Sequence, residues 1–164
     1  IFCWWPTTTT DYSVKASPWR GGKGDLVAEF SAAARKRGLA FGVYLSPQDK
    51  HRGVLIGGKA KDPERQADYE RVFRTQLTEL LTNYGDMAEV WFDGSLVFDV
   101  GDILRAHAPR AVVFQGPQAS IRWVGNEEGV APEASWNAVK SGVKTWGDYT
   151  AEESHPDGDR KSVV

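Results

Sequence analysis

Cysteine is almost missing from this chain of 164 residues, whose single thiol belongs to Cys3. One cysteine cannot form an internal disulfide, so the sequence excludes a fold that depends on disulfide bonds. Histidine is also scarce. His51, His107 and His155 are scattered along the chain without the spacing of metal ligands, and the sequence therefore predicts no metal site.

Neither one sign of charge nor a long hydrophobic run dominates the composition. The chain has 20 Lys and Arg residues against 22 Asp and Glu residues, which gives a net charge of −2. A near-neutral chain lacks the basic surface that nucleic acids require. No apolar run approaches the roughly 20 residues that span a bilayer, and no segment resembles a signal peptide. We therefore expect no nucleic-acid partner and no membrane partner.

The length of the chain limits its domain organisation, and its aromatic content indicates one type of binding surface. The chain is long enough for one domain with a real core, but short of the about 250 residues of a complete (β/α)₈ barrel. We expect one domain over residues 1–150 and a flexible, charged tail over 151–164. Seven Trp, seven Phe and five Tyr residues are typical of carbohydrate-binding surfaces, although ordinary cores use them too.

Apolar and amphipathic segments alternate along the chain. Buried strands are predicted at 39–46, 88–93 and 111–115, with a further short strand at 121–124. Helices are predicted from Asp25 to Gly38, from Asp62 to Gly85 and over 96–107. This alternation predicts βαβ units, an α/β fold and a parallel sheet, either in a (β/α) barrel or in a doubly wound open sheet.

Each predicted helix carries an apolar stripe that should face the core. The first stripe consists of Leu26, Val27, Phe30, Ala33 and Ala34. The second consists of Tyr69, Val72, Phe73, Gln76, Leu77, Leu80, Leu81 and Tyr84. The third consists of Val97, Val100, Ile103 and Leu104. These spacings follow the helical period, so we expect all three sets to be buried.

The segment EVWFDG, at 89–94, carries the strongest functional signal. An apolar, β-prone run ends there in the carboxylate of Asp93, followed at once by Gly94. Catalytic groups of a (β/α) barrel lie at the carboxyl ends of its strands. The neighbouring Trp91 and Phe92 can wall a cleft, because sugar rings stack on aromatic faces. The alternative is that Asp93 and Gly94 only turn the chain or cap the next helix.

A retaining glycosidase needs a second carboxyl group about 5–5.5 Å from the first. The candidates that follow in the chain are Asp99, Asp102, Glu127, Glu128 and Glu133. The first two fall on an expected solvated helix face. Glu127 and Glu128 follow a short apolar segment and lie in a glycine-flanked acidic turn, and chemistry alone does not separate them.

Five motifs occur in the order found in α-L-fucosidases of glycoside hydrolase family 29. They are FCWWPTTTTDYSVKASPWRGGKGDLV, GLAFGVYLSP, LTELLTNYG, EVWFDG and IRWVGNEEG. The chain resembles this family over residues 1–137. The resemblance implies a retaining exo-α-L-fucosidase that needs no cofactor and acts on terminal fucosyl linkages of oligosaccharides or glycoconjugates. Transfucosylation is the expected side activity.

The resemblance also assigns roles to individual residues. The family nucleophile corresponds to Asp93, and the acid/base of the branch that prefers α-1,3 and α-1,4 linkages corresponds to Glu127. Family residues that line the fucose pocket correspond to Tyr44 and Trp91. The further residues that we expect to bind substrate are Trp5, Arg122 and Trp123.

The chain departs from the family pattern in three places. It begins after the His-His-Asp-Gly stretch whose histidines contact fucose in the family, and the resemblance fades after Asn137. Gln48 stands where the family usually has Trp. We therefore expect a partial (β/α) barrel with parallel strands, roughly half of a TIM-like catalytic domain.

Two consequences of a partial barrel are expected. The first is an alternative function, in which the chain is a carbohydrate-binding or inert fragment that keeps its carboxylates but not a complete pocket. The second is self-association. Half a barrel leaves strand edges unpaired and the apolar faces of its strands uncovered, which favours a homo-oligomer.

Overall fold

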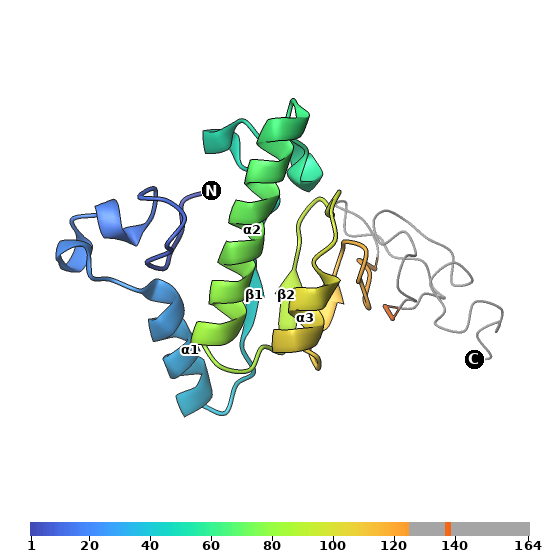
Figure 1. The fold of residues 1–164 in the computed structure, drawn as a ribbon. Helices are drawn as coiled ribbons and strands as arrows, with labels where there is room; N and C mark the ends of the chain where they lie inside the picture. The colour runs from blue at the N-terminus through green and yellow to red at the C-terminus, as the bar shows by residue number, and fades with distance from the viewer. Residues whose placement is uncertain (125–136, 139–164) are drawn as a thin grey trace, which may run out of the picture.

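The computed structural model describes residues 1–124 and 137–138 (Figure 1). Helices and strands alternate in the order α1 (Leu26–Lys36), β1 (Gly42–Tyr44), α2 (Pro63–Asn83), β2 (Glu89–Trp91), α3 (Gly101–His107) and β3 (Val112–Phe114). Short 3₁₀ turns lie in the connections, at Val14–Ala16, Trp19–Gly22, Lys50–Arg52 and Ile56–Gly58. No helix within the described ranges has both the length and the apolar character needed to cross a membrane.

The strands form one parallel sheet in the order β1-β2-β3. Val43 pairs with Val90, and Val90 pairs with Val113. The next row across the sheet consists of Tyr44, Trp91 and Phe114. A helix links each strand to the next, because parallel strands need a crossover connection. The predicted α/β class with a parallel sheet is confirmed.

Helix α2 forms where its sequence signals placed it. The Asp62 side chain accepts a hydrogen bond from Arg65 N at 2.9 Å, and Pro63 occupies the first turn, where its missing N–H costs nothing. Gly85 follows the helix with φ of +77°, a conformation that favours glycine. The predicted stripe is buried throughout: Tyr69, Val72, Phe73, Gln76, Leu77, Leu80, Leu81 and Tyr84.

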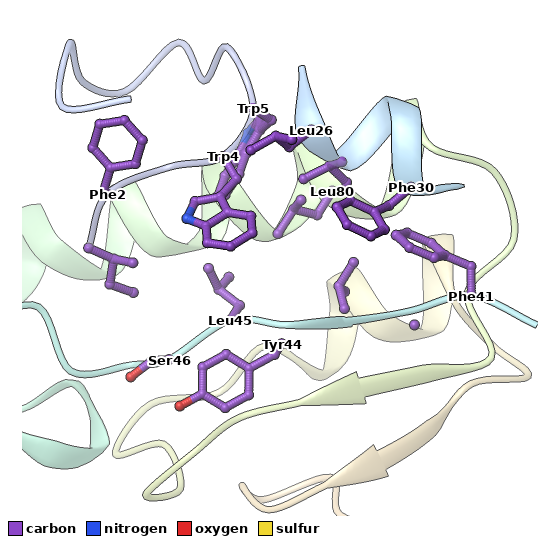
Figure 2. A pocket seen from close by; sticks show the side chains of 14 residues that line it. Phe2, Trp4, Trp5, Leu26, Phe30, Phe41, Tyr44, Leu45, Ser46 and Leu80 are labelled. Carbon is purple, nitrogen blue, oxygen red and sulfur yellow. The ribbon is translucent and has the colours of Figure 1, made fainter. Parts of the chain in front are cut away.

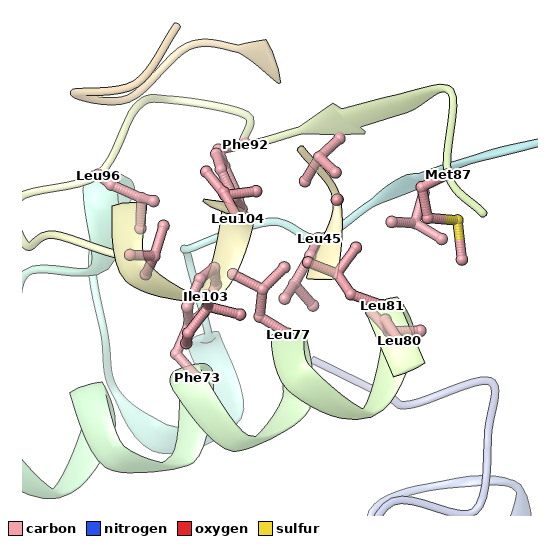
Figure 3. Packing of buried hydrophobic residues seen from close by; sticks show 14 of the residues in the cluster. Leu45, Phe73, Leu77, Leu80, Leu81, Met87, Phe92, Leu96, Ile103 and Leu104 are labelled. Carbon is pink, nitrogen blue, oxygen red and sulfur yellow. The ribbon is translucent and has the colours of Figure 1, made fainter. Parts of the chain in front are cut away.

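Helices α2 and α3 lie over the same face of the sheet (Figure 1). The valines of the first row are buried on this face, in one cluster with Phe73 and Leu77 of α2 and Ile103 and Leu104 of α3 (Figure 3). The core therefore lies between the sheet and these two helices. We call this face the covered face, and the opposite one the open face.

The prediction for the apolar stripe of α1 is wrong. Only Ser31 is buried on this helix, and the Phe30 side chain is 59% exposed. Helix α1 lies at the β1 side of the sheet and contacts the end of α2 through polar groups (Figure 1). Ser31 Oγ donates to the Tyr84 carbonyl oxygen at 2.8 Å, and Arg35 Nη2 donates to the same oxygen at 2.6 Å. Val27 and Ala28 are half-buried against the core, so α1 meets the protein through apolar as well as polar groups, and Phe30 and Ala33 are left exposed.

Helix α3 begins later than predicted, at Gly101 instead of residue 96. Val97 is 59% exposed, so its predicted inward position is wrong, whereas Val100, Ile103 and Leu104 are buried as predicted. The physical reason is a backbone contact: Val97 N donates to the Gly57 carbonyl oxygen at 2.9 Å, which holds this stretch as a loop.

The strands are shorter than predicted, with three residues each. The predicted strand at 121–124 is reduced to isolated bridges of Ile121 with Phe114 and Ala138. The predicted tail at 151–164 lies outside the described residues.

Candidate active site

Asp93 lies exposed just beyond the carboxyl end of β2. The preceding residue, Phe92, is buried, and its N–H donates to the Phe114 carbonyl oxygen at 3.0 Å, so the sheet holds the backbone up to this point. Gly94 then turns the chain with φ of +78°, and a Cβ atom there would lie 2.6 Å from Ile56 Cγ2. The carboxylate is therefore presented by a rigid strand end and a turn that requires glycine.

Tyr44, at the end of β1, holds the Asp93 carboxylate directly. Its hydroxyl donates to Asp93 Oδ2 at 2.7 Å. Burial, together with the hydrogen bond to Asp93 and the charge of that carboxylate, raises the pKa of Tyr44 above its ordinary value. The phenol therefore keeps its proton at neutral pH, and it fixes one oxygen of the carboxylate.

Aromatic rings line the open face beneath Asp93. The Trp91 ring centroid lies 6.3 Å from that of Tyr44 and 4.2 Å from that of Phe114. Trp123 meets Trp91 edge to face at 6.3 Å. The indole N–H of Trp91 is buried and has no hydrogen-bond partner among the described residues. This part of the sheet offers flat apolar surfaces of the kind on which a sugar ring stacks.

A small cavity, the Asp93 cavity, opens beside the carboxylate. It has a volume of about 220 Å³ and is lined by Ser46, Gln48, Ile56, Asp93, Gly94, Gln115 and Trp123. This volume is below the roughly 300 Å³ at which sites for drug-sized ligands begin, so the cavity suits a single sugar ring. Polar and apolar side chains both face it, as the hydroxyl-bearing and carbon-bearing sides of a sugar require.

A larger hollow, the apolar groove, lies on the other side of Tyr44. It has a volume of about 520 Å³ and runs between the N-terminal segment, α1 and β1 (Figure 2). Phe2, Trp4, Phe30 and Phe41 are among the side chains that line it (Figure 2). Ser46 lines both hollows. The groove carries no carboxylate, so we place the chemistry at Asp93.

The structure brings together four of the site residues predicted from the sequence: Asp93, Tyr44, Trp91 and Trp123. It places Trp5 elsewhere. This residue is buried at the apolar groove, and its indole N–H donates to Glu79 Oε2 on α2 at 2.8 Å.

Arg122 is buried next to Trp123, and its Nη1 donates to the Trp123 carbonyl oxygen at 3.0 Å. It does not line the Asp93 cavity. Its contact fits a residue that supports the position of Trp123.

The second carboxylate is not among the described residues. Glu127, Glu128 and Glu133 all lie outside them. Asp99 accepts from Gly101 N at 2.6 Å and from Gln118 Nε2 at 2.8 Å, and Asp102 pairs with Arg74 at 2.5 Å. Asp102 lies on the exposed side of α3, as the sequence predicted, whereas Asp99 lies in the loop before that helix, so its predicted place on a helix face is wrong. Within the described residues, no three His, Cys, Asp or Glu side chains gather where they could hold a metal ion.

Sequence reasoning missed Ser46, Gln48 and Gln115 as cavity residues. Ser46 comes two residues after β1, and Gln115 directly follows β3. Their position after a parallel strand is the signal that identified Asp93, and it would have found them too.

Comparison with known proteins gives a consistent result. The sequence profile of the family Alpha-L-fucosidase matches residues 1–159. Alpha-L-fucosidase 1 of Arabidopsis thaliana is 40% identical over 146 residues, which are 83% of this chain and 27% of the plant protein.

Solved structures agree with the sequence match. A glycoside hydrolase 29 family member from an unknown rumen bacterium is similar with a TM-score of 0.70 and 35% identity, over 94% of this chain and 30% of that one. The alpha-L-fucosidase AlfC from Lactobacillus casei, in complex with its α-L-fucose product, is similar with a TM-score of 0.53 and 25% identity, over 69% of this chain and 42% of that one.

The chain spans less than a third of the length of the curated relatives that it matches, 27% and 30% respectively. Within that span, the profile match covers nearly the whole chain, and Asp93 lies at the end of a parallel strand in a cavity that Trp123 also lines. The chain belongs to the alpha-L-fucosidase family.

Proposed function

We propose that this chain supplies the nucleophile of a retaining exo-α-L-fucosidase. The observation that carries the proposal is the Asp93 carboxylate, held by the Tyr44 hydroxyl at 2.7 Å beside a cavity of about 220 Å³. Membership of the alpha-L-fucosidase family supports fucose as the sugar, and the Lactobacillus casei relative is named as a complex with α-L-fucose.

The proposed reaction has two steps. Asp93 attacks the anomeric carbon of fucose and forms an ester, while the bond to the departing oxygen breaks and a carboxylic acid protonates that oxygen. The same acid, now a carboxylate, then takes a proton from water, which attacks the anomeric carbon and releases fucose from Asp93. A sugar hydroxyl in place of water gives transfucosylation. We assign the acid/base role to Glu127, with Glu128 as its alternative.

The described side chains fit this scheme. Tyr44 orients the carboxylate before attack, since its proton stays in place at neutral pH. Trp91 and Trp123 present ring faces and edges to the sugar. Tyr44 and Trp91 belong to neighbouring strands in direct register, so the sheet itself sets the distance between the nucleophile's hydrogen-bond donor and the aromatic wall.

We also propose that the three-stranded sheet is part of a (β/α) barrel. Within the described residues, helices cover one face of the sheet only, and the site lies at the carboxyl ends of the strands. Both features are those of a barrel wall, in which the face without helices points inward.

The test is the release of nitrophenol from an aryl α-L-fucoside by pure protein, beside an Asp93→Asn control that keeps the size of the side chain. The proposal requires turnover that the control lacks, with the α-anomer of fucose as the first product by NMR. First formation of the β-anomer would exclude retention.

A non-catalytic function is the second candidate. Its support is that, among the described residues, Asp93 is the one carboxylate that lines the cavity. It predicts that the protein binds L-fucose but releases no nitrophenol, and that Asp93→Asn binds the sugar as well as the unmodified protein does.

A further inference from the structure

Gln115 is the one cavity residue whose backbone is unusual for its type. It follows β3 directly, with φ of +62°. Glutamine has no special preference for this left-handed region, which glycine and asparagine tolerate far better. The side chain is only 2% exposed, and it lines the Asp93 cavity. A buried polar side chain on a strained backbone at the end of a strand needs a reason.

The orientation of the Gln115 amide follows from its contact. Ser95 N lies 2.8 Å from Gln115 Oε1. A backbone N–H can only donate, so the atom that faces it must be the amide oxygen and not the nitrogen. The nitrogen, Nε2, then forms the other arm of the amide. It has no hydrogen-bond partner among the described residues.

The same hydrogen bond links two residues that both have positive φ. Within the described ranges, Arg20, Ser95 and Gln115 are the residues other than glycine with positive φ. Two of these three are bonded to each other, and one of them lies two residues after Asp93. Strain of this kind collects at sites where a side chain must be aimed, because the surrounding structure has to hold it in place.

We propose that Gln115 is a specificity-determining residue, whose Nε2 donates a hydrogen bond to one ring hydroxyl of the fucosyl unit held against Asp93. This inference rests on the proposed function, since it names a further contact in the same site. Ser95 fixes the oxygen of the amide, so the donor is aimed before the sugar arrives. A neutral donor also suits this position, because Lys or Arg beside Asp93 would pair with the nucleophile.

Two substitutions separate the proposed role of Nε2, as donor to the sugar, from that of Oε1, as acceptor from Ser95 N–H. Gln115→Glu keeps an oxygen that can accept from Ser95 N–H, but it loses the donor. Gln115→Met has nearly the same length and loses both. Gln118→Met is the matched control, because the Gln118 amide donates to Asp99 at 2.8 Å and does not line the cavity. Circular dichroism melting curves check that each variant is folded.

The measurement is the affinity of each protein for four neutral sugars: L-fucose and its 2-deoxy, 3-deoxy and 4-deoxy analogues, by isothermal titration. The unmodified protein should bind one analogue about tenfold more weakly than L-fucose, the size expected for one lost hydrogen bond in a buried site. Gln115→Glu and Gln115→Met should bind L-fucose about tenfold more weakly and should no longer distinguish that analogue from L-fucose. Gln118→Met should behave as the unmodified protein.

Three results would overturn the inference: no binding of L-fucose by the unmodified protein, an equal loss for all four sugars in the Gln115 variants, or a full retention of selectivity in them. The aryl fucoside assay on the same samples reports on the proposed function separately. Selective binding without turnover would contradict the proposed hydrolase activity but would still support the contact of Gln115 with the sugar. Turnover by the unmodified protein, with an equal loss of affinity for all four sugars in the Gln115 variants, would support the hydrolase activity and exclude the contact of Gln115.

Discussion

The two faces of the sheet are built from neighbouring residues but have different properties. On the covered face, Val43, Val90 and Val113 are buried against α2 and α3. On the open face, the next residue of each strand is aromatic: Tyr44 on β1 is 58% exposed, whereas Phe114 on β3 is buried against Trp91 and Trp123. The difference shows that three-residue strands serve two purposes at once: alternate residues form the core and the wall of the site.

The largest effect should come from the open face. Asp93→Ala removes the nucleophile, and we expect kcat to fall by a factor on the order of 10⁵ or more. The melting temperature should stay close to that of the unmodified protein, because Asp93 is exposed and outside the core. Steady-state rates with an aryl α-L-fucoside give the first value and a thermal melt gives the second.

Azide offers a direct check on the role of Asp93. In the Asp93→Ala protein, it should partly restore turnover and give a fucosyl azide, since a small anion can enter the space left by the carboxylate. Wild-type-like turnover without azide would exclude Asp93 as the nucleophile.

The covered face should show the opposite pattern. Leu77→Ala removes a side chain that is 0% exposed, and we expect the free energy of unfolding to fall by about 2–5 kcal/mol. Urea titrations followed by tryptophan fluorescence measure this loss. Thr82→Ala, on the exposed side of the same helix, is the control and should change the free energy of unfolding by about 0.5 kcal/mol or less. Equal effects of the two variants would contradict the assigned core.

Tyr44→Phe tests the contact that links β1 to Asp93. Loss of the hydroxyl should lower kcat/KM about tenfold, since one hydrogen bond to a charged group is removed. The ring remains, so the melting temperature should hardly change. Tyr12→Phe is a matched control, because Tyr12 is also exposed but stacks on His51, away from Asp93. A tenfold loss in both variants would mean that the effect is not specific to the site.

Self-association is the smallest effect that we expect. β1 lies at the edge of the sheet, and the apolar groove beside it includes exposed Phe30. We predict that two copies of the chain associate through this groove, and that Phe30→Lys weakens their association about tenfold or more, since it places a charge in an apolar contact. Light scattering over a dilution series measures it. Ala32→Lys, on the exposed side of α1, is the control, and a monomer at every concentration would contradict the prediction.

The sequence predicted those parts of the fold in which periodicity and burial agree. Helix α2 keeps one apolar stripe over roughly four turns, and each member of that stripe is buried. Helix α1 has an equally clear stripe, but burial depends on what packs against it: Val27 is half-buried against the core, whereas Phe30 is exposed. Periodicity identifies an apolar face and does not say whether another element covers it.

The candidate site was predicted in the same partial way. Asp93 could be found because a carboxylate and a glycine at the end of an apolar strand are a recognisable pattern. Gln115 also follows an apolar strand and precedes a glycine, but the role proposed for it depends on a positive φ and on a contact with Ser95, 20 residues away in the chain. Trp5 was expected to bind substrate, but its indole donates to Glu79, which is 74 residues away in the chain. Contacts of this range are set by the fold and cannot be read from local sequence.

The register of the sheet gives a final consequence for folding. Because side chains alternate along a strand, a slip of β2 by one residue would turn Trp91 toward the helices and Val90 toward the open face. The same slip would move Asp93 away from the Tyr44 hydroxyl. A misregistered chain would thus lose its core and its nucleophile together. One register of β2 therefore serves both the core, through Val90, and the site, through Trp91 and Asp93.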